Sequence, residues 1–175
     1  MGIARATAAV ILALAALPAD AATTRQEEQT CPIDGEKFTA TLATSGYMRG
    51  RFLDGKPYGS ILAPPPIPKC PTSGFVVYKR TFTEDELTRL RAFVATPAYR
   101  AAAAQETTHY LLALLLEHMG APKRSIAYAR LLSTWQAADG EQYRRYAGEA
   151  LEAHKAALAA GLPPKLARAR SVAAS

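Results

Sequence analysis

The two cysteines of this 175-residue chain stand in two short segments that nearly repeat each other. Residues 31–35, the first Cys loop, read CPIDG, and residues 70–74, the second Cys loop, read CPTSG. The closing glycine of each segment allows the left-handed backbone that a tight turn behind a knuckle needs. If the two loops face each other, the chain must return on itself between them, and this constrains the fold more than any other feature.

A structural zinc site is one reading of these loops, because zinc ribbons are built from two such turns. Zinc needs four ligands there, usually two Cys-x-x-Cys pairs. The second ligand positions hold Asp34 and Ser73 instead of cysteine. The histidines lie far along the chain, at His109, His118 and His154. A metal-binding ribbon using Cys31, Cys70 and Asp34 therefore stays an alternative, and no metal or other cofactor is predicted.

A disulfide between Cys31 and Cys70 is the use that we predict for the pair. The two cysteines match the count for one bond, and two facing loops would bring their sulfurs within bonding reach. A thiol oxidoreductase is a further alternative, although redox-active cysteines favour a close Cys-x-x-Cys spacing. Two unpaired thiols would be the remaining possibility.

The N-terminal residues 1–21 have the pattern of a secretory signal peptide. A basic start precedes an apolar run at residues 6–17, and Ala-Asp-Ala follows at residues 19–21. The run is shorter than the roughly 20 residues that span a membrane. The sequence thus predicts a periplasmic or secreted bacterial protein without a transmembrane segment after cleavage. Disulfides persist in such oxidising compartments.

The chain has a formal net charge of +6, and its basic residues gather toward the C-terminus. For an exported protein, a basic surface of this kind favours contact with anionic surfaces or an acidic protein partner over nucleic acid. We therefore expect one or more protein partners in the bacterial envelope and no nucleic acid.

Composition divides the chain into segments and predicts an α+β fold. Residues 22–30 are polar and are expected to form a flexible lead-in. Residues 31–82 are rich in glycine, proline and strand formers, and predict a small, degenerate zinc-ribbon-like β module. Its strands are expected at residues 37–43 and 75–82, one after each Cys loop. Residues 83–161 predict a helical module, and residues 162–175 a tail.

Five helices are expected in the second module. Thr83 and Glu86 form the Thr-x-x-Glu pattern of a capping box, and Thr96-Pro97 is a second helix start. The expected helices span residues 84–95, 97–104, 106–119, 122–138 and 141–160. The apolar run at residues 110–116 is expected in the most buried of them. Their lengths and spacing loosely match an antiparallel tetratricopeptide-like bundle.

The glycine-rich centre of the long loop between the Cys loops mixes aromatic and charged residues. That composition suits recognition. We define the candidate recognition surface as Tyr47, Arg49, Arg51, Asp54, Lys56 and Tyr58. The structural alternative is a loop pinned over the β module, with Asp54 capping a turn.

The order of these motifs resembles a bacterial group related to the family "domain of unknown function 2225". The resemblance covers about residues 31–100, from the first Cys loop through CPTSGFVVYK and the acidic-capped helix. It implies a ribbon-like module of CP-x-C-G pairs ahead of tetratricopeptide-like helices. Because Asp34 and Ser73 replace the second cysteine of each pair, only Cys31 and Cys70 carry over. The resemblance implies architecture and no activity.

The sequence favours a non-catalytic binding or scaffold protein. It holds no nucleophile elbow, phosphate loop or dinucleotide-binding fingerprint. These patterns leave open whether the chain is an enzyme, and they favour a protein that is not one.

Overall fold

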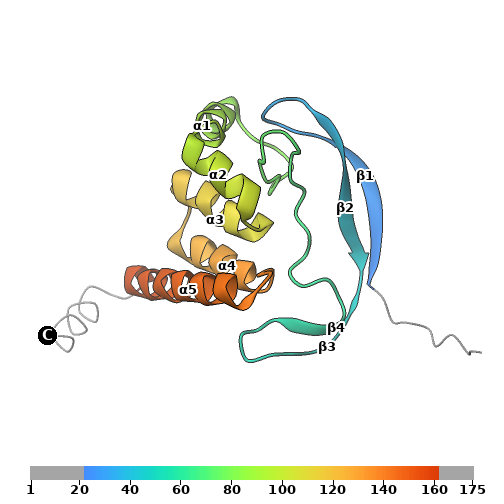
Figure 1. The fold of residues 1–175 in the computed structure, drawn as a ribbon, viewed down its shortest axis with the longest axis vertical. Coiled ribbons are helices and arrows are strands. Elements are labelled where there is room, and N and C mark those ends of the chain that lie inside the picture. The colour runs from blue at the N-terminus through green and yellow to red at the C-terminus, as the bar shows by residue number, and fades with distance from the viewer. Residues whose placement is uncertain (1–21, 162–175) are drawn as a thin grey trace, which may run out of the picture.

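The computed structural model describes residues 22–161, so the predicted signal peptide and tail lie outside the described part. Within it, two small antiparallel sheets precede a layer of helices, which confirms the α+β class (Figure 1). The strands are β1 (Thr23–Thr30), β2 (Lys37–Ser45), β3 (Tyr47–Arg51) and β4 (Pro57–Ser60). The helices are α1 (Glu84–Val94), α2 (Pro97–Gln105), α3 (Thr108–His118), α4 (Lys123–Thr134) and α5 (Gly140–Gly161). Among the described helices, none has the length and apolar character to cross a membrane.

The first sheet is the β1–β2 hairpin, whose turn is the first Cys loop. Thr30 pairs with Lys37 at the closed end of the hairpin. The prediction of a flexible lead-in at residues 22–30 is therefore wrong. β1 is polar and largely exposed, and it is held by backbone pairing and by cross-strand bonds such as Gln26 Nε2 to Thr41 Oγ1 at 3.0 Å. Composition alone could not reveal a strand stabilised in this way.

The second sheet is the β3–β4 hairpin, after which residues 61–69 return to the second Cys loop (Figure 1). The strand predicted at residues 75–82 does not form; the segment makes one isolated bridge, between Val76 and Lys69. The physical reason is the proline-rich segment opposite it. Proline has no N–H, so Pro68 accepts a hydrogen bond from Val77 at 2.8 Å but cannot donate one back.

All five helices form close to their predicted positions. The Thr83 capping box is present with both of its hydrogen bonds, and Thr96 caps α2 ahead of Pro97. The run at residues 110–116 lies in α3, but α4 is the more buried helix, with seven buried residues against four in α3. α4 buries more because it packs against both α3 and α5.

One hydrophobic core joins the Cys loops to the first three helices. Its buried residues come from both sides of the predicted boundary at Thr83: Cys31, Cys70, Phe75, Val76, Leu90, Val94, Tyr99, Leu111 and Leu115. Although α1 begins next to that boundary, the loops and helices bury their apolar side chains against each other. The two Cys loops and helices α1–α3 therefore share one core, on both sides of the predicted boundary.

Candidate functional site

Cys31 and Cys70 form the predicted disulfide, with their Cα atoms 5.7 Å apart. The bond is sealed from solvent, because the two residues are only 1% and 0% exposed. It joins the turn of the β1–β2 hairpin to the loop that precedes the helices, two segments separated by 39 positions in the sequence. Its position is that of a structural cross-link at the centre of the core.

The two Cys loops have the same backbone hydrogen bonds. In the first, the Gly35 N–H donates to the Cys31 carbonyl at 2.9 Å; in the second, the Gly74 N–H donates to the Cys70 carbonyl at 3.0 Å. Each cysteine N–H also donates, at 2.8 Å, to the carbonyl five residues further on. Both glycines have positive φ angles, 75° and 67°, as the motif predicts. The sequence repeat is thus a structural repeat.

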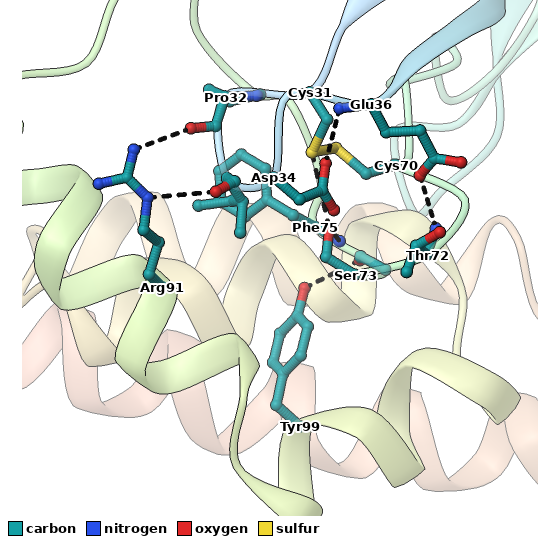
Figure 2. Close-up of a disulfide and its surroundings, with 12 residues drawn as sticks. Cys31, Pro32, Asp34, Glu36, Cys70, Thr72, Ser73, Phe75, Arg91 and Tyr99 are labelled. Atoms are coloured by element: carbon teal, nitrogen blue, oxygen red, sulfur yellow. Dashed lines mark hydrogen bonds between the residues drawn. A yellow bond between two sulfur atoms is a disulfide. The ribbon is translucent and has the colours of Figure 1, made fainter.

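Side chains outside the first Cys loop hold it in place (Figure 2). Arg91 of α1 reaches its backbone, with Nε donating to the Ile33 carbonyl at 3.1 Å. On the other side, Glu36 accepts a hydrogen bond from the Thr72 N–H of the second loop at 3.1 Å. The disulfide is therefore one of several links between the loops.

The second Cys loop is fixed by α2. Tyr99, which is buried, donates its hydroxyl to the Gly74 carbonyl at 3.1 Å (Figure 2). Burial raises the pKa of Tyr99, so this hydroxyl stays protonated as a donor. A Cβ added at Gly74 would lie 2.5 Å from the Cβ of Ala103, which shows how closely α2 covers the loop. No such neighbour lies near Gly35.

Asp34 and Ser73, at the positions of the absent cysteines, serve their own turns. Asp34 accepts the N–H of Glu36 at 3.1 Å, and Ser73 Oγ lies 3.6 Å from Cys31 Sγ. Across residues 22–161, no three or more histidine, cysteine, aspartate or glutamate side chains gather so as to hold a metal ion. With both sulfurs buried in one bond, thiol exchange would require the loops to open.

The histidines make structural contacts within the helical layer. His109 is buried with Nδ1 3.1 Å from Gln136 Oε1; burial lowers its pKa, although the Gln136 hydrogen bond acts in the opposite direction. His118 stacks on Phe93 with ring centroids 4.2 Å apart. His154 Nδ1 lies 2.8 Å from the Ala150 carbonyl. Each imidazole thus has a packing partner of its own.

The candidate recognition surface is brought together on the β3–β4 hairpin. Its aromatic members are exposed, Tyr47 at 66% and Tyr58 at 45%. Two charged members shape the turn: Arg51 Nη1 donates to the Gly55 carbonyl at 2.9 Å, and Asp54 accepts the Lys56 N–H at 3.0 Å. Asp54 therefore does cap a turn, on a hairpin that still presents aromatic side chains to solvent.

Lys56 connects this hairpin to the helices. Its Nζ donates to the carbonyl of Trp135, the C-cap residue that follows α4, at 3.1 Å. Arg49 is exposed on β3. Of the charged members, Lys56 thus acts as an anchor, because its hydrogen bond to Trp135 holds the hairpin against the end of α4.

The sequence reasoning missed the apolar residues of the same hairpin. Leu53 is fully exposed, Phe52 is 58% exposed, and Met48 is 42% exposed. The rings of Phe52 and Tyr58 lie 5.1 Å apart. A signal was present: Phe-Leu stands directly before Asp-Gly, a turn dipeptide, which places both apolar side chains at the tip of a hairpin. Together with the recognition surface they form an exposed aromatic and apolar tip.

A second cluster that the sequence did not indicate centres on Arg130 of α4. Its side chain is only 9% exposed, and it bonds Glu149 of α5 at 2.6 Å and Glu117 of α3 at 3.0 Å. Its guanidinium also lies 4.4 Å from the Tyr110 ring centroid. Burial on its own would lower the pKa of Arg130, but the hydrogen bonds and charges of Glu117 and Tyr110 together raise it. This residue ties three helices together.

Next to it, Glu106 lies between Arg145 and Tyr146. Arg145 Nη2 reaches its carboxylate at 2.8 Å, and the Tyr146 hydroxyl donates to it at 2.6 Å. Partial burial on its own would raise the pKa of Glu106, but these two hydrogen bonds, with the charges of Arg145 and Arg130, together lower it. Every charge in the cluster is matched by a partner, so the arrangement is that of a partly buried structural network.

Comparisons of this chain with protein-family models, with curated proteins and with solved structures each found no match.

Proposed function

We propose that this chain is an exported, non-catalytic binding or scaffold protein of the bacterial envelope that recognises a protein partner through the β3–β4 hairpin. The compartment is periplasmic or extracellular. A buried disulfide supports this location, because such bonds persist in oxidising compartments. The basic character of the chain also suits contact with anionic surfaces.

The observation that carries the proposal is the exposed tip of the hairpin. A folded domain gains nothing in stability by holding Phe52 and Leu53 in water, whereas aromatic and large apolar side chains dominate the energy of protein interfaces. The turn bonds and the Lys56 anchor hold the tip in one shape, which lowers the entropy lost on binding.

The architecture proposed for this protein is a degenerate, disulfide-stapled ribbon followed by tetratricopeptide-like helices. The matching hydrogen bonds of the two Cys loops support the ribbon reading. The packing of α4 against both α3 and α5 is consistent with a stack of helical hairpins. In this reading the disulfide replaces the metal as the link between the loops.

Changing Phe52 and Leu53 together to serine is expected to abolish partner binding without loss of stability, because both side chains are exposed. The measurement is capture from envelope extract after light crosslinking, using residues 22–175 and the variant at equal concentration. We expect at least a tenfold drop in the captured partner, as for the loss of interface anchors.

Tyr143→Ser is the matched control, because Tyr143 is a similarly exposed large side chain that lies outside the β3–β4 hairpin, on α5. It should capture as much partner as the unmodified chain. Equal capture by the hairpin variant, or no hairpin-dependent partner at all, would refute the proposal.

A further inference from the structure

An open groove of about 540 Å³ runs between the start of α4 and the end of α5. Its lining includes Arg124, Ala127, Tyr128, His154, Ala157 and Leu158. Because the C-terminal end of α4 carries the contact with Lys56, the groove lies at the opposite end of α4 from the β3–β4 hairpin. It is a second surface, independent of the proposed hairpin site.

The groove has large apolar walls and a small-residue floor. Tyr128 is 56% exposed and Leu158 is 60% exposed, while Ala127 is buried. Leu151, seven residues or about two turns before Leu158 on α5, is also exposed at 55%. Alanines between larger side chains leave room for an incoming apolar side chain to sit between the helices. Helix-in-groove recognition uses such a surface.

The charged groups at this groove are basic. Arg124 is exposed and has no ion pair with another residue of the described range. Lys123 stands beside it at the start of α4, where Pro122 supplies no side-chain cap. The groove lining contains no aspartate or glutamate. The nearest acid on this part of α5 in the sequence, Glu152, is paired with Lys155 at 2.8 Å. The open rim thus attracts negative charge.

The positive charge at the groove decides which binding partner fits it. The C-terminal residues 162–175 contain Lys165, Arg168 and Arg170 and no acid, so they do not complement the groove. A second copy in a two-fold arrangement would bring the same cations and no unpaired groove carboxylate. A concave surface with an alanine floor also suits a protruding side chain better than a flat membrane.

We propose that the α4–α5 groove docks an acidic amphipathic helix of a partner protein. Apolar side chains of that helix would lie against Tyr128 and Leu158, and its carboxylates would face Arg124. This gives the protein two docking surfaces, at opposite ends of α4, which is the arrangement that a scaffold needs.

The test uses defined peptides and residues 22–175. The probe is a labelled peptide of about 18 residues with leucines at helical spacing and glutamates elsewhere, and the comparison peptide has lysines in place of the glutamates. Fluorescence anisotropy should show binding of the acidic peptide, weakening as salt rises, and at least tenfold weaker binding of the basic one. Anionic phosphatidylglycerol vesicles and sedimentation of the chain alone test the other occupants.

The variants assign binding to the groove. Arg124→Glu should weaken the acidic peptide about fivefold and Tyr128→Ala about tenfold. Arg80→Glu, the same charge change ahead of α1, and the Phe52/Leu53 serine variant should bind normally, which separates this site from the hairpin. The proposal is overturned if neither peptide binds, if both bind equally, if Arg124→Glu has no effect, or if the groove variants instead impair vesicle binding or self-association.

Discussion

Replacing Cys31 and Cys70 together with alanine is expected to lower the free energy of unfolding by about 4 kcal/mol. The bond closes a loop of 39 positions, and the chain-entropy relation gives about 4 kcal/mol for a loop of that length. Typical domains have only 5–15 kcal/mol of stability. Removing the disulfide would therefore leave the chain marginally folded.

Urea denaturation of the variant against the oxidised protein measures this loss. The unmodified protein unfolded with and without reductant gives a second estimate that involves no substitution. Ser73→Ala, which alters a polar side chain beside Cys31 but keeps the bond, should change stability by less than 1 kcal/mol. A loss below about 1 kcal/mol for the double variant would show that the other loop contacts suffice and that the disulfide is not the principal link.

Changing Arg130 to methionine is expected to cost about 3 kcal/mol. The substitution keeps much of the apolar length of the side chain but leaves Glu117 and Glu149 without their shared cation. Breaking a buried ion pair from one side typically costs 3–5 kcal/mol. The two carboxylates are partly exposed, which puts the expected cost at the lower end of that range.

Arg144→Met is the matched control, since Arg144 is an exposed arginine on the same helix as Glu149. It should stay within about 0.5 kcal/mol of the unmodified chain in the same urea experiment. Adding Glu117→Gln and Glu149→Gln to the Arg130 variant should recover part of the loss, because the two carboxylates that shared the lost cation are then neutral amides. An Arg130 variant as stable as the control would contradict the structural role of the network.

The features that the sequence predicted well are those with local chemistry. The helix starts at Thr83 and Thr96 are each determined by a capping side chain and its neighbours within a few residues. The turn at Asp54-Gly55 is likewise determined by a local hydrogen bond, from the Lys56 N–H to Asp54. The Cys loops belong here too, since Cys-Pro and a closing glycine determine each loop internally. The disulfide followed from the cysteine count and the facing of two similar loops.

The features that the sequence concealed depend on partners distant in the chain. β1 is polar on both faces and becomes a strand only because β2 pairs with it. Residues 75–82 have strand composition, but the prolines opposite them lack the N–H groups that a ladder needs. Arg130 looks like an ordinary surface arginine until α3 and α5 place glutamates on either side of it.

The burial of α4 and the exposure of the hairpin tip also depend on contacts between residues that are distant in the sequence. The most apolar run in the helical module belongs to α3, yet α4 is buried more because it has a helix on each side. The turn at the hairpin could be predicted, but the exposure of Phe52 and Leu53 depends on nothing else in the described chain covering them.

The central proposal is that the chain is exported and that its two Cys loops stay joined by the Cys31–Cys70 disulfide. Intact mass of the chain recovered from the periplasm, with thiol alkylation before and after reduction, tests both parts in one sample. We expect the mass of residues 22–175 and two alkyl groups added only after reduction. A mass that retains residues 1–21, or two thiols that label without reductant, would contradict the account.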